Sequence, residues 1–379
     1  MRIGIDARLW NETGVGRYIR NLVSELQKID KKNQYVLFVT PELFASKIFD
    51  FIQGKDTKWS IVSTDIRWHS VEEQLLFYKV LENEYLDLVH FPYFSIPVLY
   101  NRPYVITIHD LIINHFPTGK ASTLPLPLYY IKRFGYQYIL KQVSKKANKI
   151  ITVSEATKKE IIDHLPVSAE KVVVTYEGVD ISLQKNVLDK KTLPKLLNNS
   201  SYFLFVGNAY PHKNVERLLD AFHILLQKNP DVKLILVGKM NYFYERLQEK
   251  VQKMNLQKNV IFTGAVNDIE LKALYAQAEA LVFPSLMEGF GLPGLEAMQM
   301  KCLVLASDIP VFNEIYGEAA VYFDPLVVQD MSDTMQKVLS DKKTFEEIKT
   351  NGSALVHTFS WETMAKETLK IYENSISIR

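Results

Sequence analysis

Two carboxylates, Glu288 and Glu296, lie eight residues apart in a glycine-rich stretch of the sequence. Pro293 suits the first turn of a helix, which would put Glu288 in the preceding loop and Glu296 one turn inside. Backbone N–H groups at a helix N-terminus are unpaired and positively polarised, so those of Phe290–Leu292 could bind a phosphate. Glu296 could then accept hydrogen bonds from a ribose diol. A capped helix with a surface glutamate is the alternative, but it does not explain so bare a loop.

Polar side chains also follow three other strand-like runs. Lys213 comes after an apolar run, where its ammonium could neutralise a diphosphate; a solvated lysine is the simpler explanation for this residue alone. His109 and Asp110 end the run Tyr104–Ile108, and a histidine at the carboxyl end of a buried strand is well placed to face a site. Ser154 is expected to cap a helix.

A pair of glycines, Gly14 and Gly16, opens the first helical pattern. Glycines at a helix start let a ligand approach the backbone N–H groups, as in dinucleotide sites. The third glycine of that fingerprint is missing, and the run Tyr35–Thr40 lacks a terminal acid to hold a ribose, which argues against NAD. A helix start with tight turns explains the pair equally well.

Short apolar runs alternate with helical patterns along the whole chain. The runs are mostly continuously apolar, as expected for strands of a parallel sheet buried on both faces. A helix is expected at Gly14–Ile29, where apolar residues recur at helical spacing. The expected strands are Arg2–Ile5, Tyr35–Val39, Leu86–His90, Tyr104–Ile108, Ile150–Val153 and Val172–Thr175 in the first half, and Tyr202–Val206, Lys233–Val237, Val260–Phe262, Ala280–Phe283, Leu303–Ala306 and Ala320–Phe323 in the second.

The expected fold class is therefore α/β, with two Rossmann-like, doubly wound domains facing a cleft. Residues 183–201 lack periodicity and indicate a linker. The domains are expected at 1–182 and 202–360, with a C-terminal helix at 361–379 returning to the first domain. Ligands of such sheets bind outside the carboxyl ends of the strands, so the chemistry is expected in strand-to-helix loops that face the cleft.

Composition excludes several classes of protein. A formal charge of +2 gives no reason to expect nucleic acid as a partner, and an apolar fraction of 47% excludes disorder as the main state. Cys302, the one cysteine, excludes a disulfide framework and a cysteine-based zinc site, and its apolar run predicts a core position. No uninterrupted apolar segment reaches about 18 residues, and the N-terminus lacks a signal-peptide core, so a cytoplasmic protein is expected.

The segment Pro284–Met298 resembles the E-x7-E motif of retaining glycosyltransferases of the GT-B fold, in particular their large family 4. This block is highly specific. The resemblance covers nearly the whole chain and keeps the order of the family's other motifs, which are weak alone. They are Thr13-Gly-Val-Gly-Arg-Tyr18, Ile108-His-Asp-Leu111, Val153-Ser-Glu155, Glu177-Gly-Val-Asp180, Val206-Gly-Asn208 with Lys213-Asn214, and Phe262-Thr-Gly264.

The resemblance implies that the second domain binds a nucleotide-sugar. Three residues are implied in catalysis: Lys213 at the diphosphate, Glu288 at the donor sugar, and His109 reaching that sugar from the first domain. The implied donor-binding set is Gly16, Asn208, Lys213, Gly264, Val266, Glu288, Gly289, Phe290, Gly291, Leu292 and Glu296. The implied acceptor-side set is Gly14, Arg17, Asp110 and Ser154.

The family mechanism is transfer with retention at the anomeric carbon. No side chain is an obvious nucleophile, so front-face displacement is favoured, with the leaving diphosphate stabilised by Lys213 and the helix N-terminus. The family often carries arginine where this chain has Asn208, and His212 is expected to supply part of the missing charge. No Asp-x-Asp motif stands near these blocks, so neither a cofactor nor an essential metal is expected.

The expected reaction moves a hexose, best mannose from GDP-mannose, to a glycan or lipid-linked glycan acceptor in surface-polysaccharide synthesis. The start motif and the Lys-Asn helix entry look like mannosyltransferases of that kind. UDP-sugar and dTDP-sugar donors stay open, and a non-catalytic nucleotide-sugar-binding subunit is a further alternative.

Residues 124–149 combine aromatic and basic side chains. Such a helix could lie on an anionic bilayer, at the inner face of the plasma membrane, and meet a lipid-linked acceptor there. An ordinary helix packed on the sheet, with its lysines in water, is the slightly favoured alternative.

Overall fold

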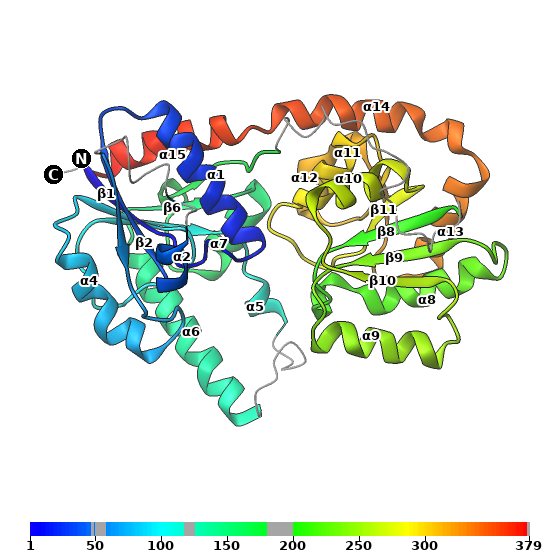
Figure 1. Ribbon diagram of the computed structural model, residues 1–379, viewed down its shortest axis with the longest axis horizontal. Coiled ribbons are helices and arrows are strands. Elements are labelled where there is room, and N and C mark those ends of the chain that lie inside the picture. Colours follow the sequence, from blue (N-terminus) through cyan, green and yellow to red (C-terminus); the bar gives the residue numbers. More distant parts are fainter. Residues whose placement is uncertain (47–48, 50–57, 117–125, 180–199, 377–379) are drawn as a thin grey trace. The chain divides into compact units, whose positions relative to one another are not determined.

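The chain forms two compact units in the computed structural model, which describes residues 1–46, 49, 58–116, 126–179 and 200–376 (Figure 1). Unit 1 comprises Met1–Leu111, Leu124–Gly178 and Ser360–Arg379, and unit 2 comprises Ile112–Thr123 and Val179–Phe359. The expected linker at 183–201 lies outside the described residues, apart from its last two.

Unit 1 is built on a seven-stranded parallel sheet in the order β3-β2-β1-β4-β5-β6-β7. Strand order reverses between β1 and β4, which is the kind of position where ligands bind in doubly wound sheets. The inner strands are buried because helices cover both faces. The strands are β1 (Arg2–Asp6), β2 (Gln34–Val39), β3 (Trp59–Ser63), β4 (Leu88–Phe91), β5 (Tyr104–Ile108), β6 (Lys149–Thr152) and β7 (Val172–Val174).

The helices of unit 1 include the last helix of the chain. Helix α1 buries the side that carries Tyr18, Ile19 and Leu22, as its spacing predicts. Helix α15 packs against α1 and against β4, β5 and β6, which confirms that the C-terminal helix returns to the first domain (Figure 1). The helices are α1 (Gly14–Ile29), α2 (Pro41–Ala45), a π-helix (Glu73–Phe77), α4 (Tyr78–Glu82), α6 (Leu126–Lys146), α7 (Glu155–His164), a 3-10 helix (Ala169–Lys171) and α15 (Trp361–Ile376).

Unit 2 repeats the architecture on a six-stranded parallel sheet in the order β10-β9-β8-β11-β12-β13. One face of the sheet packs with helices α8, α9 and α13 in a single hydrophobic core. The strands are β8 (Tyr202–Val206), β9 (Lys233–Val237), β10 (Val260–Gly264), β11 (Ala280–Phe283), β12 (Val304–Ser307) and β13 (Val321–Phe323). The helices are α5 (Ile112–His115), α8 (Val215–Leu226), α9 (Tyr242–Lys253), α10 (Asp268–Gln277), α11 (Leu292–Gln299), α12 (Pro310–Tyr316), α13 (Val328–Ser340) and α14 (Glu346–Leu355), with 3-10 turns at Pro211–Lys213, Gly317–Ala319, Lys342–Phe345 and Val356–Thr358.

The sequence pattern does not predict one strand, β3. It is an edge strand that pairs only with β2 among the described strands, and it is mostly half-exposed. Serines at positions 60 and 63 interrupt its apolar character because an edge strand does not need two buried faces. The two α/β domains agree with the expected fold class, but Ile112–Thr123 belongs to unit 2 rather than to the first domain. Cys302 is buried, which agrees with its predicted core position.

Among the described residues, none of the helices combines the length and the apolarity needed to cross a bilayer.

Candidate active site

Lys213 and Glu288 meet at the carboxyl edge of the sheet in unit 2. Strand order reverses between β8 and β11, so the loops that follow these strands converge there. Lys213 Nζ lies 2.5 Å from Glu288 Oε1, and the two side chains are only 15% and 10% exposed. The structure therefore joins two of the predicted catalytic residues, which are 75 residues apart in sequence.

Neighbouring groups hold this ion pair in place. Ser285 Oγ donates a hydrogen bond of 2.6 Å to Glu288 Oε1. The backbone N–H of Leu286 donates to the carbonyl of His212 at 2.7 Å, which ties the two loops together. Because both loops are fixed, the ammonium of Lys213 is positioned before any ligand arrives. Ser285 was not singled out from the sequence, although it stands three residues before a candidate carboxylate.

His212 does not supply the missing positive charge. Burial, together with the charge of the neighbouring Lys213, lowers the pKa of His212 to about 4. The ring is therefore neutral near pH 7, and the expectation that it replaces a family arginine is wrong. Asn208 is half-buried, and its Oδ1 accepts a hydrogen bond of 3.4 Å from the N–H of Tyr210. Lys213 supplies the charge in this loop.

Helix α11 starts where the sequence predicts, and Gly291 makes this start possible. Gly291 has φ +107°, a left-handed conformation that favours glycine. Its carbonyl accepts a hydrogen bond of 2.5 Å from Tyr316 Oη, and burial raises the pKa of this phenol, so it stays protonated. A Cβ atom on Gly291 would lie 2.3 Å from that oxygen. The first amides of α11, from Leu292 onward, therefore begin at a tightly built turn beside Glu288.

Glu296 lies one turn inside α11 and is 8% exposed. Tyr275 Oη donates to Glu296 Oε2 at 3.2 Å, a contact that the sequence does not predict because Tyr275 belongs to α10. Gly264 ends β10 and Val266 lies between β10 and α10, at the same edge of the sheet. Gly264 has φ +72° and open space where a Cβ would stand, and Val266 is half-buried.

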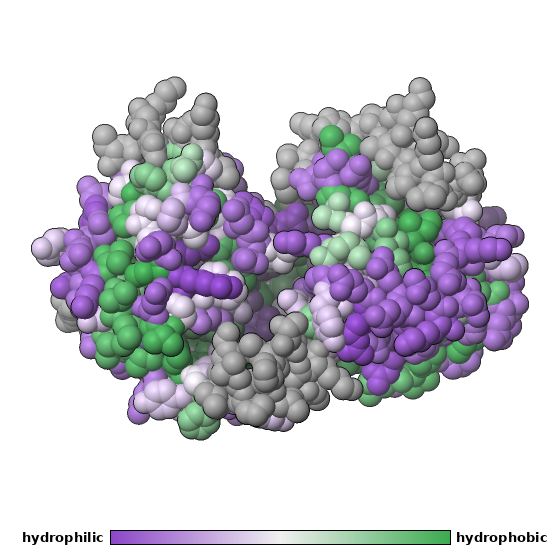
Figure 2. Space-filling view, turned by 60° about the horizontal axis from the view of Figure 1, so that its bottom comes forward, coloured by the Kyte–Doolittle hydropathy of each residue, from purple (hydrophilic) through white to green (hydrophobic). Residues whose placement is uncertain are grey.

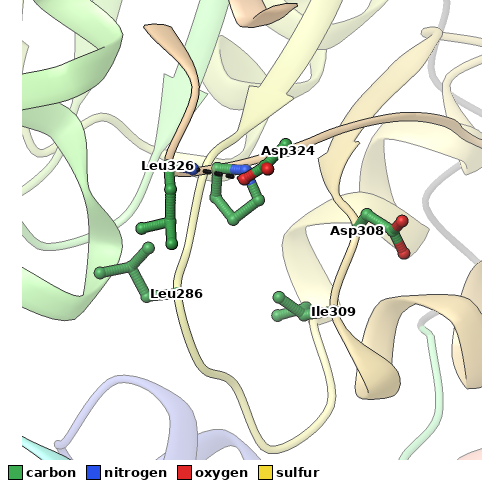
Figure 3. Close-up of a pocket in the computed structure, with 6 residues that line it drawn as sticks. Leu286, Asp308, Ile309, Asp324 and Leu326 are labelled. Carbon is green, nitrogen blue, oxygen red and sulfur yellow. Dashed lines mark hydrogen bonds between the residues drawn. The ribbon is translucent and has the colours of Figure 1, made fainter.

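A cavity of about 450 Å³ opens beside this site (Figure 3). Leu286 and Leu326 line one part of it, and Asp308 and Ile309 line another. The Asp324 carboxylate accepts a hydrogen bond of 2.8 Å from the N–H of Leu326, which holds that turn. All of these residues follow β11, β12 or β13, so the cavity extends the carboxyl edge that carries Glu288.

In unit 1, His109 stands at the end of β5 and is held from both ring nitrogens. Its Nε2 lies 3.0 Å from the carbonyl of Pro92, which can only accept, so Nε2 carries a proton. Its Nδ1 lies 3.3 Å from Glu177 Oε1. Tyr18 packs edge-on against the ring, with centroids 4.9 Å apart. The sequence pattern does not identify Glu177 as a site residue, although its position just after β7 places it at the same edge.

The other predicted residues of unit 1 differ in their surroundings. Gly14 is exposed, whereas Gly16 is buried, and a Cβ on Gly16 would lie 2.5 Å from the carbonyl of Trp10. Arg17 and Asp110 are half-buried. The side chain of Ser154 accepts a hydrogen bond of 3.1 Å from the N–H of Thr157, which confirms it as the cap of α7. These contacts give Gly16 and Ser154 clear structural roles.

A buried charge cluster, Asp6–Arg8–Glu73, lies at the carboxyl end of β1 and was not expected from the sequence. Arg8 Nη2 is 2.7 Å from Asp6 Oδ2 and 2.6 Å from Glu73 Oε1. Burial raises the pKa of Glu73, while the charge of Arg8 opposes this change. The guanidinium also lies 3.7 Å from the ring centroid of Phe77. In the sequence, only the Asp-x-Arg spacing at the end of a strand indicates such a cluster.

Each half of the chain matches a known protein family. Residues 13–183 match the family Glycosyltransferase Family 4, and residues 190–355 match Glycosyl transferases group 1. The chain belongs to the GT-B glycosyltransferases. The first matched segment contains β2 to β7 of this glycosyltransferase, and the second contains all strands of the second sheet together with Lys213, Glu288 and Glu296.

Relatives of this glycosyltransferase include two bacterial enzymes. It is 33% identical to the O-antigen chain mannosyltransferase RfbU of Salmonella typhimurium over 61% of this chain and 59% of that protein. It is 28% identical to the O-antigen chain mannosyltransferase B of Escherichia coli over 95% and 96% of the two chains. The fold is shared with Anabaena HepE, solved with UDP and glucose, at a TM-score of 0.76 and 19% identity over 99% of this chain and 100% of that one.

Proposed function

We propose that this glycosyltransferase moves a hexose from a nucleotide-sugar to a glycan or lipid-linked glycan acceptor in surface-polysaccharide synthesis. Mannose from GDP-mannose is the proposed donor because relatives are named O-antigen mannosyltransferases. The observation that carries the proposal is the Lys213–Glu288 pair beside the start of α11. A cation, a carboxylate and helix amides at one sheet edge match the diphosphate and the hydroxyls of such a donor.

In the proposed complex, the donor's diphosphate attracts Lys213 and the amides of Gly289–Leu292. Glu288 accepts hydrogen bonds from the sugar hydroxyls, and Glu296 accepts them from the ribose. The turn at Gly264–Val266 flanks the base. Asn208 adds hydrogen bonds but no charge.

The proposed chemistry is front-face displacement with retention at the anomeric carbon. The bond from that carbon to the diphosphate breaks, the bond to the acceptor oxygen forms on the same face, and a diphosphate oxygen takes the acceptor's proton. Lys213 and the α11 amides stabilise the charge that develops on the leaving group. No divalent metal is required in this scheme. An NMR assignment of the product's anomeric configuration, with and without EDTA, tests both parts.

Donor binding gives the direct test of the proposal. GDP-mannose at 100 times its dissociation constant should stabilise the protein by about 2.7 kcal/mol. UDP-glucose, dTDP-rhamnose and ADP-glucose serve as competing arms of a thermal-shift screen. Lys213→Ala should lose most of the shift, whereas Lys258→Ala, an exposed lysine before β10, should keep it. A larger shift with another nucleotide-sugar would reassign the donor, and no shift with any of them would reject the function.

We also propose that α6 touches an anionic membrane where the acceptor is lipid-linked. Tyr130, Phe134 and Tyr138 are exposed and recur every four residues, so they share one side of the helix. Lys141 and Lys145 continue that side and are exposed too. Figure 2 shows hydrophobic residues exposed beside hydrophilic ones on the face of unit 1 that it presents. Aromatic rings followed by lysines suit the interface of an anionic bilayer.

Sedimentation with liposomes tests this contact. Vesicles that contain anionic lipid should retain the protein at low salt and release it as the salt concentration rises. Phe134→Ser should weaken the retention several-fold, whereas Tyr242→Ser, an exposed aromatic of unit 2, should not. Equal retention by neutral and anionic vesicles, or none by either, would retire the membrane proposal and leave the donor site untouched.

A further inference from the structure

Four aromatic rings of unit 1 form a continuous cluster, which we call the aromatic shelf: Trp68, His69, Tyr93 and Phe94. The ring of His69 stacks on both Tyr93 and Phe94, with centroids 5.5 and 5.3 Å apart. Tyr93 and Phe94 lie 3.8 Å apart, and Trp68 meets His69 edge-on at 5.1 Å. Phe94 is buried in the core, whereas Trp68, His69 and Tyr93 are half-buried, so three rings of the shelf are partly open to solvent.

The shelf lies at the carboxyl edge of the sheet in unit 1. Trp68 and His69 follow β3, and Tyr93 and Phe94 follow β4, one strand of the pair where strand order reverses. The residue before Tyr93 is Pro92, whose carbonyl holds the ring of His109. The shelf is therefore continuous with the His109 site.

Hydrogen bonds connect the buried charge cluster to the loops that carry the shelf. Ser95 Oγ donates to Glu73 Oε1 and Oε2 at 2.6 and 2.7 Å, and the N–H of His69 donates to Glu73 Oε2 at 3.0 Å. Glu73 is in turn paired with Arg8. His69 itself has φ +56°, a left-handed backbone that is uncommon for a residue with a side chain.

Stability alone does not account for this arrangement. Burying an arginine with two carboxylates gains little over an apolar cluster of the same shape, and a strained backbone at His69 costs free energy. The cluster holds the loops after β3 and β4 in one geometry, so that their rings stack. A strained backbone that is held by surrounding contacts is typical of binding sites.

We propose that the aromatic shelf binds a sugar ring of the acceptor glycan. The C–H face of a hexopyranose packs on the electron-rich faces of aromatic rings, and sites for such ligands combine rings with a few fixed polar groups. This inference rests on the proposed function, because the acceptor is taken to be a glycan. A nucleobase would also stack on these rings, and the experiment below includes it as a competing outcome.

Tryptophan fluorescence can measure ligand binding at the shelf without any sugar transfer. The protein has four tryptophans, and Trp10, Trp59 and Trp361 are buried whereas Trp68 is half-buried. Titration with α-linked mannotriose should give a saturable change in emission. The change should vanish in Trp68→Phe and persist in Trp59→Phe, whose ring lies at the start of β3. A response to GDP alone, or an unaltered response in Trp68→Phe, would overturn the proposal.

Kinetics give the second readout. Tyr93→Leu keeps an apolar side chain but removes the ring, and it should raise KM for the mannotriose acceptor about tenfold, the equivalent of about 1.4 kcal/mol. Donor affinity and kcat should change little, and Tyr93→Phe should restore KM. An unchanged acceptor KM in folded Tyr93→Leu would reject the shelf. If wild type binds no nucleotide-sugar, the proposed function fails instead, while the fluorescence titration still tests the shelf.

Discussion

At the scale of single residues, neighbouring groups hold the candidate side chains of each unit before a ligand binds. In unit 2, Lys213 pairs with Glu288, and in unit 1, His109 contacts Glu177 and the carbonyl of Pro92. A group fixed by its neighbours loses little entropy when a ligand binds, so the ammonium of Lys213 can act on a developing charge at once. Glu288 therefore has two duties: it positions Lys213, and it is proposed to bind the donor sugar.

Glu288→Gln removes the negative charge at this position and keeps the size of the side chain. The amide can still accept a hydrogen bond from Ser285, but it no longer pairs with the Lys213 ammonium. We expect kcat for sugar transfer to fall by about two to three orders of magnitude with the fold retained. Steady-state kinetics and circular dichroism check this, with Glu279→Gln, a half-buried glutamate before β11, as the matched control. Wild-type kcat in Glu288→Gln would contradict the assignment.

At the scale of elements, one turn sets where α11 begins. Gly291 adopts a left-handed backbone, and Tyr316 fills the space where a side chain would project. Gly294, in the first turn, faces the same phenol, since a Cβ there would lie 2.3 Å from its oxygen. The amides that are proposed to bind phosphate thus depend on a contact between α11 and α12.

Gly291→Ala should destabilise the protein by about 3 kcal/mol because backbone strain adds to a clash with a buried tyrosine. Gly317→Ala is the matched control: its φ is also positive, at +49°, but no atom lies within 4 Å of the added Cβ. That variant should lose only about 1 kcal/mol. Urea unfolding measures both. Equal losses would mean that Tyr316 does not enforce the turn.

At the scale of the whole molecule, the chain's last helix packs on the first unit. His90 on β4 connects Tyr372 of α15 to Thr107 of β5, with distances of 2.6 and 2.8 Å to its two ring nitrogens. Burial, with a smaller effect of the nearby His109, lowers the pKa of His90 to about 3. The histidine that ties the C-terminus to the sheet is therefore neutral in the folded protein.

This link predicts a stability that depends on pH. A buried neutral histidine binds fewer protons than the same residue in the unfolded chain, so lowering the pH below about 6.5 favours unfolding. Between pH 6.5 and 4.5, His90 should remove about 2 kcal/mol of stability. Replacing it, as in His90→Gln, should flatten the pH dependence by that amount, whereas His223→Gln, an exposed residue, should not. Urea unfolding at several pH values gives the free energy of unfolding of wild type and His90→Gln as a function of pH. The two curves should diverge as the pH falls, and parallel curves would contradict the prediction.

The sequence by itself determined the elements and the residue types of the candidate site. Continuous apolar runs predicted all but one of the strands described, because strands buried on both faces of a parallel sheet need such runs. The spacing from Glu288 to Glu296 predicted a loop followed by a helix because glycine and proline constrain the backbone locally. These properties are encoded within a few residues, so they can be seen without the fold.

Only the tertiary structure decided which distant groups meet. The pairing of His109 with Glu177, the neutral state of His212, the charge cluster around Arg8 and the shelf at Tyr93 all depend on strand order and burial. β3 escaped prediction for a related reason: an edge strand has only one neighbour to satisfy, so its sequence is less constrained. Contacts between distant segments leave no local pattern, because they arise only when the loops converge at one edge of a folded sheet.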